Sequence, residues 1–220
     1  MTPGRSLRHR IEQSARATMV GAAEVELELM SDVPDLPPYE PHSSSLRGRV
    51  DFDQGRCFLA GPDGRWILDV ADEYHFQDGR WILAKGSPGT HAMIHPAWLL
   101  GLLARDDAVT SATETDGGEI VAELDVDVAD RTASAGIWPE WRLIARLHVE
   151  NGRISRMVLD TLDQTSPRPV TSEEFRLSPR QSIAAVELPP AECVVLSETY
   201  IEEQMDRELA DGEPYPDDEP

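Results

Sequence analysis

Cysteine, basic residues and long apolar runs are all scarce in this 220-residue chain. Its two cysteines, Cys57 and Cys193, are too few for a disulfide scaffold, and we expect two reduced thiols. Twenty Lys and Arg stand against 41 Asp and Glu, so the formal net charge is −21 and nucleic acid is a poor partner. No window approaches the roughly 18 apolar residues of a membrane span. The first twenty residues have no continuous apolar run, so no signal peptide is predicted and we expect a soluble, cytoplasmic protein.

Catalytic, metal-binding and nucleotide-binding motifs are also missing. No G-x-S-x-G or G-x-G-x-x-G occurs, although triad residues that meet only in the fold are left open. His91 and His95 are four apart, but Pro96 begins a helix and leaves both histidines on the preceding loop. Asp125 and Asp127 alternate along a predicted strand, which is typical of any solvent-facing strand. We therefore expect no enzyme, no metal and no cofactor.

Hydrophobic residues make up 40% of the chain, which is enough for one sizeable core. Residues 1–19 are predicted to form an amphipathic helix that packs on the domain, with a membrane-surface role as the alternative. Its apolar stripe has a spacing of four and comprises Leu7, Ile11, Ala15 and Met19. Residues 20–195 are predicted to form a single domain. Residues 196–220 are predicted to be a helix followed by a solvated tail, because residues 201–220 carry nine acids against one arginine.

Alternation with a period of two predicts an antiparallel sheet with one solvent-facing side, beginning with Val25 and Leu27 between glutamates. Prolines and serines predict a long loop over residues 33–45, with a polyproline ligand as the alternative. Further strands are predicted at residues 120–128, 141–149, 153–162, 172–177 and 183–188. The Asn151-Gly152 turn predicts a hairpin that pairs Glu150 with Arg153 and Val149 with Ile154.

The hexapeptide DGRWIL occurs twice, at residues 63–68 and 78–83. Each copy places Asp-Gly before an apolar run, which predicts a local meander over residues 56–84. Alternate strands of a meander run in the same direction, so we expect Trp66 and Trp81 on one face. The run from His95 to Arg105 is apolar nearly all round and predicts a buried helix, with Trp98, Leu99, Leu102 and Leu103 turned inward.

The order of these elements resembles the LolA/LppX-like lipoprotein carrier fold, in its actinobacterial branch. The segments that carry the resemblance are LRGRVDF at residues 46–52, the tryptophan strand at 80–83 followed by PAWLL at 96–100, the strands 119–128 and 141–160, and the segments 172–176 and 186–190. The resemblance implies an α+β fold: a strongly curved antiparallel sheet that forms an incomplete, half-open barrel, with helices across its concave side. It also implies an apolar cavity for acyl chains. The sequence departs from the family because it shows no signal peptide and no N-terminal cysteine for a lipid anchor.

Two functions follow as expectations. The first is a non-catalytic binding protein for a lipid-like or other hydrophobic ligand, whose cavity wall comprises Trp66, Trp81, Trp98, Leu99 and Leu102. The simpler alternative is that these side chains only fill the core. The second is a protein-interaction, regulatory or immunity-type module whose acidic surface recognises a basic protein partner. The alternative to this second function is that the acidic surface only keeps the protein soluble.

Overall fold

The structure is a computed structural model, and it describes residues 3–31, 42–62, 64–69, 72–85, 95–133, 140–163 and 168–210. The elements are α1 (Pro3–Thr18), β1 (Ala22–Ser31), β2 (His42–Asp51), β3 (Arg56–Gly61), β4 (Gly64–Asp69), β5 (Asp72–Gln77), β6 (Arg80–Ala84), α2 (Pro96–Leu103), β7 (Val109–Glu114), β8 (Ile120–Leu124), α3 (Val126–Ala133), β9 (Trp141–Glu150), β10 (Arg153–Asp163), β11 (Pro169–Arg180), β12 (Val194–Leu196) and α4 (Ser197–Ala210), with a short 3-10 turn at Ala191–Cys193. The predicted amphipathic helix, the buried helix and the C-terminal helix correspond to α1, α2 and α4.

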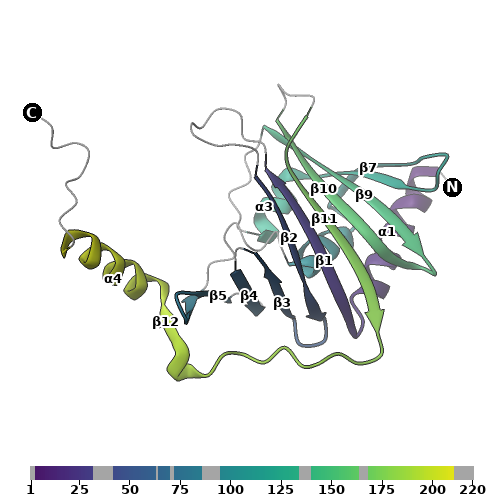
Figure 1. Cartoon of the computed structure of the whole chain (residues 1–220). Coiled ribbons are helices and arrows are strands. Elements are labelled where there is room, and N and C mark those ends of the chain that lie inside the picture. The colour runs from purple at the N-terminus through teal and green to yellow at the C-terminus, as the bar shows by residue number, and fades with distance from the viewer. Residues whose placement is uncertain are drawn as a thin grey trace, which may run out of the picture.

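The twelve strands of the described residues belong to one sheet, in the order β12-β6-β5-β4-β3-β2-β1-β11-β10-β9-β8-β7 (Figure 1). Every neighbouring pair is antiparallel except β12 with β6, and the two ends of the sheet do not pair with each other. The predicted α+β class and incomplete barrel are confirmed. The predicted meander over residues 56–84 is also confirmed, as β3 to β6.

Alternation along the central strand β1 defines the two faces of the sheet. Val25 and Leu27 are buried, whereas Glu24 and Glu26 between them are exposed. We call the side of Val25 and Leu27 the concave face and the opposite side the outer face. Gly48 of β2 lies opposite Val25, and a Cβ atom there would come within 1.7 Å of the Phe58 carbonyl oxygen. Glycine therefore permits the close approach of β2 and β3 at this position.

The hairpin of β9 and β10 has the predicted register. Glu150 pairs with Arg153 and Val149 with Ile154, and the intervening Asn151 and Gly152 have φ values of 51° and 75°. Both residues are in the left-handed region that a type I′ turn requires.

Helices α1, α2 and α3 pack on one another and on β7, β9 and β10 (Figure 1). Ile11 and Ala15 of the predicted stripe are fully buried, and Leu7 and Met19 pack partly buried beside them. The buried Thr18 hydroxyl accepts a hydrogen bond of 2.8 Å from the Ile154 amide of β10. Through these contacts α1 packs against β10 and the main core.

Three predicted elements are wrong. Residues 126–128 belong to helix α3, because the Asp125 carboxylate accepts a hydrogen bond of 3.0 Å from the Val128 amide and starts a helix there. Residues 43–45 belong to β2, where pairing with β1 overrides their weak strand preference. Residues 183–188 form no strand, because this segment crosses the sheet instead of lying along a neighbouring strand. The prolines of the predicted loop, from 34 to 41, lie outside the described residues.

The C-terminal segment forms an arm along the outer face. Residues 181–190, which we call the strap, lead from the end of β11 towards β12 (Figure 1). Val186 of the strap is fully buried in a second apolar cluster with Ile67, Tyr74 and Leu83. Helix α4 then docks beyond β12, where the buried Tyr200 hydroxyl donates to Asp78 at 2.7 Å.

Candidate functional site

The concave face is the side of the sheet on which a ligand was expected, and it is apolar across most of its width. The strand register places one row of fully buried inward side chains across β8, β9, β10, β11, β1 and β2, namely Ile120, Leu147, Met157, Phe175, Leu27 and Leu46. The same face continues into β3 and β4 through Cys57, Leu59 and Leu68. These residues and helix α2 form one continuous core.

Helix α2 carries three of the five predicted ligand-binding residues. Leu99 and Leu102 are fully buried and fill the core. Trp98 is partly buried against the same core, and its indole Nε1 is buried without a hydrogen-bond partner among the described residues. A buried N–H without a partner is rare in native structures. Trp98 is thus the residue of α2 whose environment requires an explanation beyond packing.

The start of α2 is fixed by His95, whose Nδ1 accepts a hydrogen bond of 3.0 Å from the Ala97 amide. Burial lowers the pKa of His95 to about 4, against an opposing effect of a backbone hydrogen bond to Gly55. The ring is therefore neutral at physiological pH and serves as a helix cap. His91 lies outside the described residues. In the described part of the chain, no group of three or more His, Cys, Asp or Glu residues is arranged to hold a metal ion.

Trp66 lies on the concave face of β4, partly buried against the main core. Its ring stacks on His75 of β5, with 4.9 Å between ring centroids and an interplanar angle of 4°. A Cβ atom on Gly64, where φ is 151°, would approach His75 Nε2 to 2.8 Å. Glycine at position 64 therefore leaves room for His75 to stack on Trp66, and this stack sets the orientation of the Trp66 ring.

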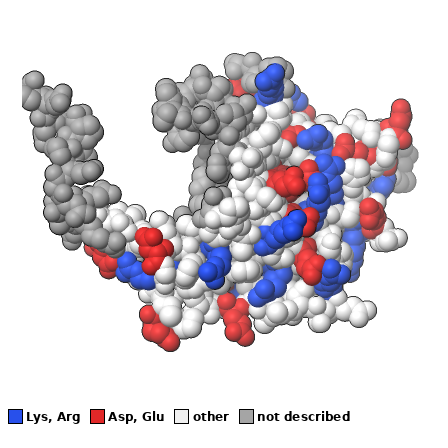
Figure 2. Space-filling view, in the orientation of Figure 1, with Lys and Arg blue, Asp and Glu red and all other residues white. Residues whose placement is uncertain are grey.

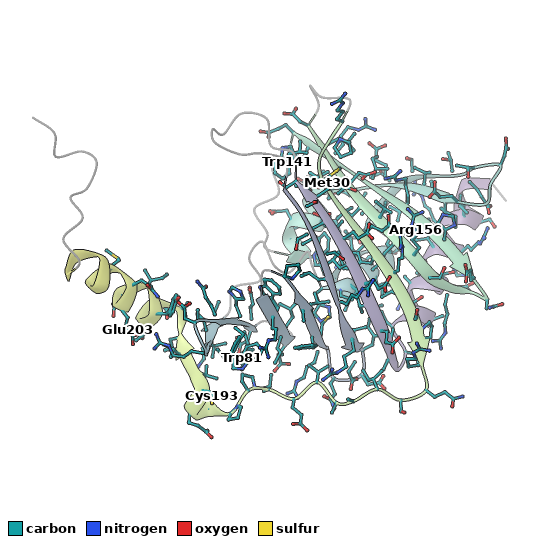
Figure 3. All side chains as sticks on the ribbon, in the orientation of Figure 1. Met30, Trp81, Trp141, Arg156, Cys193 and Glu203 are labelled. Carbon is teal, nitrogen blue, oxygen red and sulfur yellow. The ribbon has the colours of Figure 1, made fainter. Side chains whose placement is uncertain are left out.

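Trp81 lies on the outer face, so the expectation that it shares a face with Trp66 is wrong. Trp66 pairs with His75, whereas Trp81 pairs with the next residue, Phe76, and successive residues of a strand point to opposite faces. Trp81 packs instead in the cluster under the strap and contacts Phe76 edge to face (Figure 3).

The reason for this reversal is a one-residue displacement between the two copies of the hexapeptide. The first turn is closed by the pair Gly61 and Gly64, which makes Trp66 the third strand residue after the turn. The second turn is closed by Gln77 and Arg80, which makes Trp81 the second. A shift of one residue moves a side chain to the other face.

Two carboxyl groups on the concave face were not anticipated. The register aligns Glu73 of β5 with the inward Leu68, and Glu173 of β11 with the inward Leu159. Both glutamates are buried, and burial raises the pKa of each to about 7. For Glu173 a hydrogen bond from Thr171 opposes this shift. The signal in the sequence was an acid in the inward phase of a strand that continues as Phe175 and Leu177.

The outer face carries charges of both signs rather than a uniform acidic surface (Figure 2). Glu174 accepts from Arg156 at 2.8 Å and contacts Arg176 at the same distance, and these hydrogen bonds lower its pKa to about 2. Asp160 pairs with Arg146 at 2.8 Å. A groove of about 670 Å³ beside this network is lined by polar residues such as Glu28, Ser172 and Glu174 together with the apolar Leu29, Met30 and Pro62.

The sequence matches no family model and no curated protein. The structure is similar to the crystal structure of LprF from Mycobacterium bovis, with 14% sequence identity over 87% of this chain and 100% of that chain and a TM-score of 0.46. It is also similar to a LolA superfamily protein from Nitrosomonas europaea, with 11% identity over 86% of this chain and 96% of that one and a TM-score of 0.42. No helix in the described ranges is long and apolar enough to cross a membrane.

Proposed function

We propose that the chain is a non-catalytic binding protein that holds a lipid-like or other hydrophobic ligand against the concave face of its unclosed sheet. The observation that carries the proposal is the state of two tryptophans on the core side. Trp66 and Trp98 both pack on the main apolar core, yet both keep part of their surface exposed. Binding sites for apolar molecules are typically lined by such aromatic side chains with a few polar groups.

The five predicted residues take different roles in this proposal. Trp66 and Trp98 contact the ligand, and Nε1 of Trp98, which has no partner in the described part of the chain, offers it a hydrogen-bond donor. Leu99 and Leu102, which are fully buried, support the wall from behind. Trp81 is outside the site because it lies on the outer face.

A fluorescent apolar probe, such as a naphthylamine dye, tests the proposal. We expect one-to-one binding that persists at high salt and weakens about tenfold in Trp66→Ala and in Trp98→Ala, since each change removes a contacting ring. Trp81→Ala is the matched control, because it removes an equal ring from the outer face and should leave probe affinity unchanged. Native mass spectrometry of the purified protein should show a co-purified apolar molecule. Absence of probe binding to the wild-type protein refutes the proposal.

A second function is favoured by one specific feature of the arm. Leu196, Ile201 and Met205 are exposed large hydrophobic residues along β12 and α4, between acidic residues such as Glu198 and Glu202. An apolar stripe with acidic flanks suits a basic amphipathic segment of a protein partner. In this case a basic amphipathic peptide should bind the wild-type protein, and its affinity for the Ile201→Asp variant should be lower. The complex should dissociate at high salt, which shortens the Debye length from about 8 Å.

A further inference from the structure

The concave face changes character along its strands. On β1 the inward residues run from Ala23 through Val25, Leu27 and Leu29 to Ser31. On the neighbouring β11 the inward sequence is Leu177, Phe175, Glu173 and Thr171. Both strands therefore pass from apolar to polar side chains at the same end. An apolar face with one polar end is the surface that an amphiphilic molecule would match.

Glu173 and Thr161 are the most deeply buried members of this polar end. Glu173 is 7% exposed and Thr161 is 1% exposed. Thr161 pairs with Thr171 across β10 and β11, and Leu159 pairs with Glu173. Glu173 and Thr161 are thus diagonal neighbours on one face, a relation that places Cα atoms about 7–8 Å apart.

Each of these two side chains has a buried polar atom without a partner among the described residues, namely Oε2 of Glu173 and Oγ1 of Thr161. Leu143, Leu159 and Leu29 flank the pair on β9, β10 and β1, and Thr171, which pairs with Thr161, bonds to Glu173 but leaves these two atoms without a partner. Leaving a buried polar atom unpaired is unfavourable, and native proteins show few such atoms. Two adjacent cases on one face indicate a site for a group that comes from outside the chain.

We infer that Glu173 and Thr161 form a subsite for a neutral hydroxyl head group of an amphiphilic ligand whose hydrocarbon part lies along the apolar concave face. A hydroxyl group both donates and accepts hydrogen bonds. It donates to Oε2 of Glu173 and accepts from the hydroxyl of Thr161. Two O–H···O bonds of about 2.7 Å bridge two oxygen atoms about 5 Å apart, which fits diagonal neighbours on a sheet. This inference rests on the proposed function and specifies its ligand class.

The same geometry disfavours other head groups. Above about pH 7, where Glu173 is ionised, a carboxylate would place a second negative charge beside it, and the negative charge of Asp160 already acts on this group. A methyl ester can accept from Thr161 but has no proton to donate to Glu173. The subsite therefore distinguishes an alcohol from a fatty acid and from its ester with the same chain length.

Displacement of the bound dye by 1-dodecanol, dodecanoate and methyl dodecanoate tests this selectivity. We expect 1-dodecanol to displace the dye at concentrations about tenfold lower than the other two. In Thr161→Val and Glu173→Leu, the three compounds should come within about twofold of one another. Should Glu173→Leu fail to fold, Thr161→Val carries the test, because valine is nearly isosteric with threonine.

The matched control is Ser172→Ala, which removes a hydroxyl from the adjacent outward position, where it donates to Asp160 at 2.7 Å. This variant should keep the preference for the alcohol. A second readout is the thermal midpoint without ligand, which should stay equal or rise in Thr161→Val because the lost hydroxyl has no partner.

The outcomes separate the two proposals. If the dye binds and the three head groups displace it equally, or if Thr161→Val keeps the preference, the subsite is refuted and a buried water is the better explanation of the two polar atoms. If no dye binds the wild-type protein, the proposed function fails and the subsite fails with it.

Discussion

The strap across the outer face makes a quantitative prediction about stability. Val186 is 1% exposed and lies in the cluster with Ile67, Tyr74 and Leu83, so Val186→Ala removes two methyl groups from a closed apolar contact. Transfer of two methyl groups is worth about 1.6 kcal/mol, and the residual cavity raises the expected loss to about 2 kcal/mol. For a chain of this length, such a loss lowers the thermal midpoint by about 4–8 °C.

Urea unfolding followed by tryptophan fluorescence measures this loss, with Trp81 of the same cluster as a local reporter. Val186→Asp should go further and detach the strap, because the carboxylate cannot stay unpaired among apolar side chains. Detachment should speed cleavage by a glutamate-specific protease after the neighbouring Glu187. Ala184→Asp is the matched control, since it adds the same charge at an exposed strap position. If the two aspartate variants unfold and are cleaved alike, the strap does not contribute to the fold as described.

The remaining predictions concern the core, a helix cap and pH. Trp98→Phe should change the free energy of unfolding by less than about 1 kcal/mol, because the lost N–H bonds to no described residue. Trp98→Ala should cost about 3 kcal/mol, and equal losses of the two variants by urea titration would contradict this. Asp125→Ala should cost about 1 kcal/mol by removing the cap of α3, and Asp125→Asn should restore most of it in thermal unfolding. Burial raises the pKa of Glu73 and Glu173 from 4.5 to about 7, so the folded state holds protons that the unfolded chain has released, and the thermal midpoint should fall as the pH rises from about 5 to 7. Glu173→Gln should make this decline shallower, and an unchanged slope would show that Glu173 does not titrate as described.

The sequence predicts elements well where two independent signals agree. The hairpin of β9 and β10 has a positive-φ turn pair, Asn151-Gly152, together with matching charge and apolarity on its strands. Helix α2 was predictable because a proline start and an apolar run indicate the same buried helix. The predicted strand was wrong after Asp125. An aspartate there can either face solvent on a strand or cap a helix, and the alternation of polar and apolar residues does not distinguish these two structures.

The candidate site was less predictable because it depends on strand register. Identical sequences at residues 63–68 and 78–83 place their tryptophans on opposite faces, since the two turns close at different residues. Glu173 was overlooked because acidic residues on alternating strands usually face solvent. Its inward phase becomes evident only when Phe175 and Leu177 are assigned to the concave face.

The position of β1 has a consequence for how the chain folds during synthesis. One edge of β1 pairs with β2, but its other edge pairs along its whole length with β11, from Ala22 opposite Arg180 to Ser31 opposite Thr171. The ribosome releases β1 long before β11. The edge of β1 that pairs with β11 therefore stays unpaired until most of the chain has been made. Unpaired edges promote association with other chains, and distant pairings form slowly. Exposed Glu24 and Glu26 on β1 place negative charge beside that edge, which should keep nascent chains apart while they await the late strand.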